Sequence, residues 1–144
     1  LKGREGDGIV PKEEKRKLME EIVGKLHQLV DPKTGEKVVT QAFISEDQFS
    51  KDFLDRAPDI IVGCNRGYRV SGSSALGSMK PEVITDNMDW WSGDHCMNPM
   101  HVPATFIANF KINKTVPHIM DMAPTILKHF GIGTPTEMKG KSLI

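Results

Sequence analysis

The stretch Ala-Pro-Asp-Ile-Ile-Val at residues 57–62 is the clearest indicator of the fold. Its three aliphatic residues form a continuous apolar run, and Pro58 ends any helix that precedes it. A short uninterrupted run of this kind is typical of a strand buried on both faces, as in a sheet covered by helices. The residues around it should therefore belong to an α/β architecture.

Helices and further strands are predicted on both sides of this run. Apolar residues recur with a period of 3.6 over residues 12–30, which indicates a helix starting after Pro11. The remaining predictions are short helices at 45–54 and 122–130, strands at 38–44, 67–70 and 105–110, and a flexible loop at 71–78. These strands are too few for a self-sufficient doubly wound sheet, so we expect a piece of a larger α/β domain.

Composition excludes few functions. The 144 residues include 19 basic and 19 acidic ones, so net charge gives no reason to expect nucleic acid or an anionic membrane as partner. No apolar run approaches the length of a membrane span. Cys64 and Cys96 are too few for a disulfide framework and form no CxxC pair. The chain begins at Leu1 without Met, and we expect it to be part of a longer protein whose compartment the sequence leaves open.

Chemistry-bearing residues gather in one irregular segment, DNMDWWSGDHCMNPMHVP at 86–103. In one interpretation His95 binds a metal ion, with Gly93 allowing close backbone approach. In a second, Asp94 and His95 perform acid–base chemistry, although adjacent residues rarely face each other. In a third, Trp90 and Trp91 bury apolar area and the histidines form ordinary hydrogen bonds. Residue types alone narrowly favour the third.

Four stretches resemble one family. WSGDHCMNPMHVP at 91–103 resembles an element of the type I phosphodiesterase/nucleotide pyrophosphatase proteins, within the alkaline phosphatase superfamily. KGREGDGIV at 2–10, APDIIVGCNRGYRVS at 57–71 and the segment 120–143 resemble further parts of the same family pattern. The 120–143 signature is shared across the superfamily, whereas the 91–103 element is more discriminating.

The resemblance implies the C-terminal part of an alkaline-phosphatase-like core, a mixed or parallel sheet with flanking helices. Residues 57–144 would supply core and metal loop, and residues 1–56 a cap or inserted lobe. It implies a metal-dependent phosphoesterase acting on a small phosphate ester, such as a nucleotide, with two divalent ions, zinc or manganese. The metal ligand in this chain would be His95. Sulfatase or phosphotransferase activity on the same scaffold, and a non-catalytic structural or oligomerisation module, are the alternatives.

The nucleophile and the remaining ligands of the family pattern fall upstream of the matched region. We therefore expect no catalytic residue in this chain, and no activity from the chain alone. Two positions depart from the pattern. Asn98 replaces the usual Asp, which removes a charge, and Ala104 replaces a Gly, which would be strained at a positive φ.

Other polar residues carry weaker expectations. Asp94 should either support the metal ligand from behind or shape the loop, without binding metal itself, and Asp59 and Asp121 should be structural caps. The three histidines expected to be ordinary are His101, His118 and His129. A last group has two open interpretations, contact with substrate or a structural turn: Asn65, Arg66 and Tyr68.

Overall fold

The computed structural model describes residues 1–91, 93–94 and 97–144. It divides into two compact units, Leu1–Pro103 and Ala104–Ile144, each described below by itself. The predicted metal ligand His95 lies outside the described residues, as do Ser92 and Cys96. In the described part, no helix is both long and apolar enough to cross a membrane.

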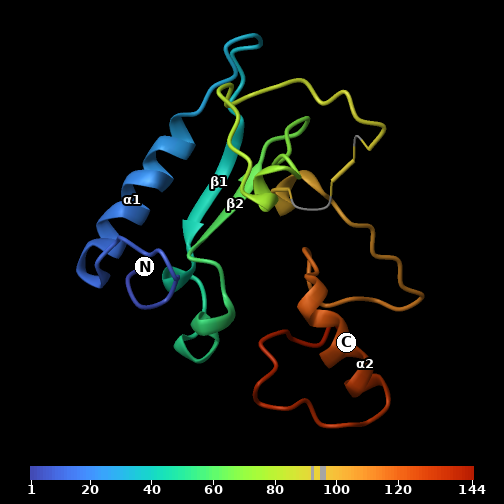
Figure 1. The fold of residues 1–144 in the computed structure, drawn as a ribbon. Helices are drawn as coiled ribbons and strands as arrows, with labels where there is room; N and C mark the ends of the chain where they lie inside the picture. The colour runs from blue at the N-terminus through green and yellow to red at the C-terminus, as the bar shows by residue number, and fades with distance from the viewer. Residues whose placement is uncertain (92, 95–96) are drawn as a thin grey trace. The chain divides into compact units, whose positions relative to one another are not determined.

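The first unit is built from helix α1 (Lys12–Gln28) and an antiparallel pair of strands, β1 (Val39–Ile44) and β2 (Ile60–Cys64) (Figure 1). Helix α1 begins after Pro11, as the sequence predicts. It packs along β1, and the Nε2 atom of His27 accepts a hydrogen bond of 3.1 Å from the backbone N–H of Ala42. Met19 is its fully buried residue.

The two strands pair from Val39 opposite Cys64 to Ile44 opposite Ile60, with an irregularity in register between Val39 and Gln41. The described sheet contains these two strands alone, so the prediction of a mixed α/β chain is confirmed only at that coarse level. Residues 60–62 are half-buried, and β2 becomes fully buried only at Gly63 and Cys64. The prediction that residues 60–62 are buried on both faces is therefore wrong within this structure. Among the described residues, no third strand pairs with the sheet and no helix besides α1 packs along it.

Several other predicted elements differ from the structure. The helix expected at 45–54 is replaced by two 3₁₀ turns, Ser45–Asp47 and Lys51–Arg56. The segment 71–78 contains one turn of 3₁₀ helix, Ser74–Leu76, which ends at Gly77 with φ of 80°. The segments 67–70 and 105–110 form no strand. Strands need partners for their backbone groups, and local sequence does not specify partners.

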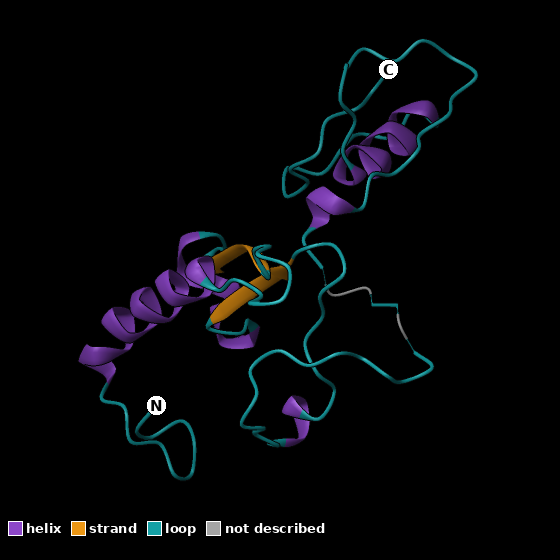
Figure 2. Ribbon diagram, turned by 90° about the horizontal axis from the view of Figure 1, so that it is seen from above, coloured by secondary structure: helices purple, strands orange, loops and turns teal. Residues whose placement is uncertain are grey.

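The second unit is organised around helix α2 (Met122–His129), which follows a 3₁₀ turn at Ile119–Asp121 (Figure 2). As predicted, Pro124 lies in its first turn, and the chain leaves it at Gly131 with φ of 70°. The tail returns to the helix, where the backbone N–H of Leu143 donates to Thr125 Oγ1 at 3.0 Å. Leu143 is fully buried and forms the centre of this unit.

Candidate functional site

The segment after position 95 is attached to the carboxyl end of β2. Met97 forms an isolated parallel bridge with Cys64, and the backbone N–H of Asn98 donates to the carbonyl oxygen of Cys64 at 3.3 Å. The chain then turns into a short 3₁₀ helix, Pro99–His101. Met97 and Asn98 are thus held at the carboxyl end of β2.

Asn98 has a structural role that depends on its amide. It is 5% exposed, and its Oδ1 accepts from the N–H of Met100 at 3.0 Å while its Nδ2 donates to Thr40 Oγ1 at 2.9 Å. An ionised aspartate could accept the first hydrogen bond but could not donate the second. The amide of Asn98 thus bonds two neighbours at once, one as acceptor and one as donor. Ala104 carries no strain, since no described residue other than glycine has a positive φ.

Arg69 holds the segment that precedes position 95. Its Nη1 donates to the carbonyl oxygens of Trp91 at 3.1 Å and Gly93 at 3.4 Å, and its Nε lies 3.9 Å from Asp94 Oδ2. Asn87 Nδ2 donates to the same Trp91 oxygen at 2.8 Å. Sequence patterns gave no indication of the Arg69 contacts, because Arg69 is more than twenty positions away from Trp91 and Gly93. Asp94 thus lies beside the Arg69 guanidinium that binds the neighbouring main chain.

The structural interpretation of the tryptophans is wrong for this structure. Trp90 is 103% exposed and Trp91 82% exposed, so neither buries its ring. Arg69 binds the backbone at Trp91 and not its ring, so the segment is fixed by polar contacts to main-chain atoms. The two rings thus remain available for contacts beyond the described residues.

Cys64 is a buried free thiol beneath this loop. Burial, followed by the charge of Asp94, raises the pKa of the Cys64 thiol above its usual value. The thiol is therefore protonated at neutral pH, the form that is neither a metal ligand nor a nucleophile. Cys64 serves the packing at the end of β2.

In the turn at residues 65–68, two of the three candidate substrate-contact residues form hydrogen bonds within the fold. Tyr68 Oη donates to Asp31 Oδ2 at 2.9 Å, and Asn65 Nδ2 donates to the carbonyl oxygen of Lys37 at 2.8 Å. These bonds tie the turn to the segment between α1 and β1. Arg66 is exposed, and its guanidinium has no hydrogen-bond or ion-pair partner among the described residues. The structural interpretation thus accounts for Asn65 and Tyr68.

Of the two expected caps, Asp121 is one, whereas Asp59 forms ion pairs instead of capping a described helix or turn. Arg4 Nη1 donates to Asp59 Oδ1 at 2.9 Å and Lys15 Nζ lies 3.0 Å from the same oxygen; mainly through Arg4, these cations hold the pKa of Asp59 far below its usual value. Asp121 is 2% exposed and closes a capping box with His118 around the 3₁₀ turn Ile119–Asp121 that precedes α2. Asp59 thereby secures the N-terminal segment to β2.

The other two histidines also have ordinary surroundings. His101 Nε2 lies 3.3 Å from Thr40 Oγ1, which ties the 3₁₀ turn after Asn98 to β1. The ring of His129 meets that of Phe130 edge-on, with centroids 5.3 Å apart. Neither contact suggests a ligand or catalytic role.

Residues 1–91, 93–94 and 97–144 contain no group of three His, Cys, Asp or Glu side chains that could hold a metal ion. Comparisons of the chain with protein families, with curated proteins and with solved structures found no match. On either side of position 95 the chain is held by polar contacts: Arg69 binds the carbonyl oxygen of Trp91, and Asn98 binds that of Cys64.

Proposed function

We propose that this chain is part of a metal-dependent phosphoesterase and supplies one metal ligand, His95. The substrate class is a small phosphate ester, including nucleotide-like esters. The proposal rests on the resemblance of residues 91–103 to the phosphodiesterase/nucleotide pyrophosphatase element. One structural observation supports it: the loop is anchored on both sides of position 95 at the carboxyl end of β2.

The chemistry explains why such anchoring matters. Two divalent ions, zinc or manganese, would stabilise the charge on the oxygens of the transferring phosphoryl group when bound. A metal ligand must be held in a fixed direction. Mutation of the residues that orient a metal ligand typically lowers metal affinity 10–100-fold. Arg69 and Asn98 fix the main chain before and after position 95 in this way. The other ligands and the nucleophile would come from polypeptide outside these 144 residues, so the isolated chain would be inactive.

Replacement of His95 by Ala tests the proposal in the full-length protein. We expect hydrolysis of a nitrophenyl phosphodiester, measured with added zinc or manganese, to fall by more than about 100-fold, since a direct ligand should exceed the effect of its supporting groups. His101→Ala, in the same loop and bonded to Thr40, is the matched control and should retain most activity. Intact turnover in the His95 variant would refute the metal-ligand role.

A non-catalytic packing or oligomerisation module is the second candidate. Exposed apolar residues border a hollow of about 510 Å³ in the second unit, including Phe106, Ile107 and Ile126, and such surfaces are typical of contact sites. Absence of turnover in the full-length wild-type protein on both nitrophenyl phosphodiester and nitrophenyl sulfate would favour this candidate. Preferential turnover of the sulfate would favour a sulfatase.

A further inference from the structure

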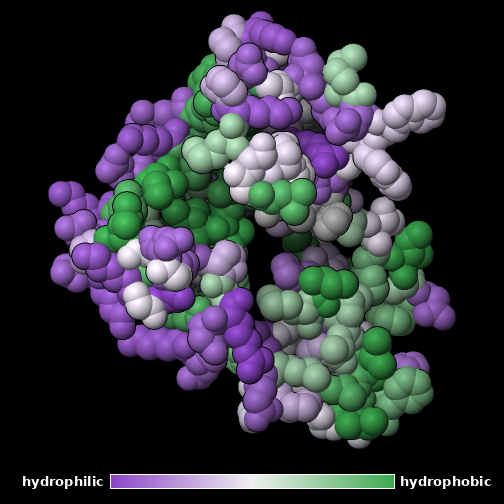
Figure 3. All heavy atoms as spheres, in the orientation of Figure 1, coloured by the Kyte–Doolittle hydropathy of each residue, from purple (hydrophilic) through white to green (hydrophobic). Residues whose placement is uncertain are grey.

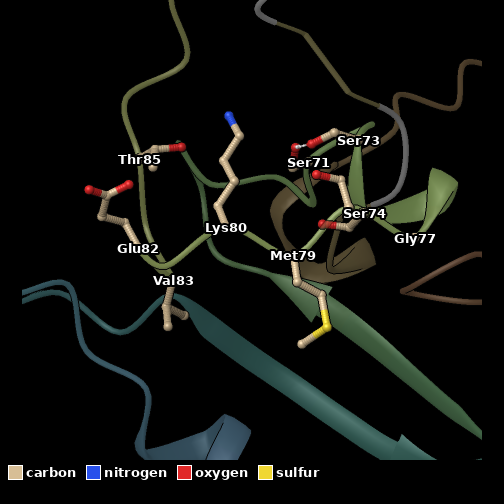
Figure 4. Close-up of a pocket in the computed structure, with 10 residues that line it drawn as sticks. Ser71, Ser73, Ser74, Gly77, Met79, Lys80, Glu82, Val83 and Thr85 are labelled. Atoms are coloured by element: carbon tan, nitrogen blue, oxygen red, sulfur yellow. Dashed lines mark hydrogen bonds between the residues drawn. The ribbon is translucent and has the colours of Figure 1, made fainter.

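The segment 71–85 surrounds a pocket of about 470 Å³, within the size range of small-molecule sites (Figure 4). Half of its ten lining residues carry a hydroxyl group, and Met79 and Val83 add apolar surface. Five hydroxyl side chains and one ammonium group line it: Ser71, Ser73, Ser74, Ser78, Thr85 and Lys80. None of them has a role in the metal loop described above.

The lining groups match a ligand that both donates and accepts hydrogen bonds. Each serine or threonine hydroxyl offers one donor and two acceptor positions. Ser71 Oγ and Ser73 Oγ lie 2.8 Å apart and bond to each other, which leaves further acceptor capacity on both. Figure 4 shows Lys80 between these serines and the wall formed by Glu82 and Thr85.

The charges at the pocket favour a neutral ligand over an anion. Lys80 has no ion-pair partner among the described residues, so its three N–H donors remain available. The carboxylate of Glu82 lines the same pocket and would oppose a phosphate there. A polyhydroxylated group, in contrast, can accept from Lys80 and donate to Glu82 at once.

The pocket is physically connected to the metal loop. Arg69 and Asn87 flank the segment 71–85 on its two sides, and both donate to the carbonyl oxygen of Trp91, at 3.1 Å and 2.8 Å. The two ends of the pocket segment therefore converge on the residues that precede His95 in sequence. The pocket segment is thereby tied at both ends to the loop where the proposed function puts the phosphate.

We propose that this pocket binds the alcohol portion of the phosphate ester, and that this portion is a neutral polyol such as a cyclitol or sugar. The inference rests on the proposed phosphoesterase function for the meaning of the site, but binding can be measured without turnover. Hydroxyl groups of the ligand exchange hydrogen bonds with the serine wall, and Lys80 and Glu82 orient the ring between them.

The test uses ligand-observed NMR and calorimetry on the full-length protein, with myo-inositol as probe and cyclohexanol as its poorly hydroxylated counterpart. We expect saturable binding of myo-inositol and none of cyclohexanol. Lys80→Met and Ser74→Ala should each weaken inositol binding, by about tenfold for the lysine, as expected for loss of a hydrogen bond from a charged group. Lys51→Met, at an exposed lysine in the 3₁₀ turn Lys51–Arg56, is the control.

The outcomes separate this inference from the proposed function. Equal binding of both probes, no binding of inositol, or equal weakening by Lys51→Met would overturn the polyol pocket. Circular dichroism of each variant would show that folding is retained. Failure of inositol binding together with zinc-dependent diester hydrolysis would remove the pocket alone. Inositol binding without any hydrolysis would remove the phosphoesterase function and leave a polyol-binding site.

Discussion

At the residue scale, Arg69 is the side chain that fixes the main chain just before position 95. Its guanidinium reaches two carbonyl oxygens and the Asp94 carboxylate, a pattern that needs several N–H donors in a fixed plane. We expect Arg69→Lys to keep the charge but lose this geometry. Zinc affinity of the full-length protein, measured by competition with a chelating dye, should fall about 10–100-fold.

The neighbouring Arg66 gives this prediction a matched control. Arg66 is exposed and its guanidinium has no partner in the part of the chain that the structure describes. Arg66→Lys should therefore leave zinc affinity unchanged. Equal affinities of the Arg69 and Arg66 variants would show that the contacts at Trp91 and Gly93 do not position a ligand.

Asp121 should make the second unit sensitive to acid. Lys114 Nζ lies 2.6 Å from its Oδ2, and the N–H groups of Lys141 and His118 also donate to the carboxylate, so its pKa is held far below the usual value. A carboxyl with a depressed folded-state pKa stabilises the fold above its unfolded pKa of about 3.9, and this stabilisation is lost as pH falls toward the folded value.

Replacement of Asp121 by Asn should consequently lower the midpoint of thermal unfolding at neutral pH by several degrees. The midpoint should also fall less steeply below about pH 4 in the variant than in the wild type. Asp55→Asn, at an exposed residue of the first unit, is the control. Parallel acid profiles of wild type and Asp121→Asn would contradict the assignment.

At the element scale, the close approach of β2 to Asn98 can be tested at a glycine. A Cβ atom added to Gly63 would lie 3.0 Å from both Cα and Cβ of Asn98 and 3.3 Å from Cβ of Gln41. Gly63→Ala should therefore push the loop from β2 and destabilise the protein by about 1–3 kcal/mol. Urea unfolding measures the change.

Gly24, within helix α1, is the matched comparison. A Cβ atom there would meet nothing within 4 Å, and Gly24 has no positive φ. Gly24→Ala should accordingly stabilise the protein by up to about 1 kcal/mol, because alanine favours helix. A stabilising or neutral Gly63→Ala would mean that the loop does not pack on β2 as described.

These elements also show where sequence prediction succeeds. The helix at residues 12–28 follows from the 3.6-residue period after Pro11, and the strands around residues 39–44 and 60–64 follow from their β-branched and aliphatic runs. The segments 67–70 and 105–110 have strand composition but no strand structure, because pairing depends on residues distant in sequence. The contacts that hold the loop could not be predicted from the sequence for the same reason. Asn98 bonds Thr40 and Arg69 bonds Trp91 only because the fold brings these distant residues together.

At the scale of the whole molecule, both units leave many apolar side chains open to solvent, and Figure 3 shows such residues on the viewed face of each. In the first unit, Leu76, Met79 and Trp90 are each at least 89% exposed. In the second, Ile107 and Ile119 are 87% and 79% exposed. Exposure on this scale marks contact surfaces. If the proposed function holds, the rest of the phosphoesterase domain would cover them.

Trp91 reports on that cover. It is 82% exposed here, so in the isolated chain its fluorescence should be quenched by acrylamide almost as readily as that of a free indole. The emission of Trp91 alone is obtained by subtracting the fluorescence spectrum of Trp91→Phe from that of the wild type. In the full-length protein we expect this emission to shift to shorter wavelength and to resist quenching, because burial removes the ring from water. Equal quenching in the isolated chain and in the full-length protein would show that the surface around Trp91 stays exposed. That result would favour the packing or oligomerisation module over an enzyme whose active site encloses this loop.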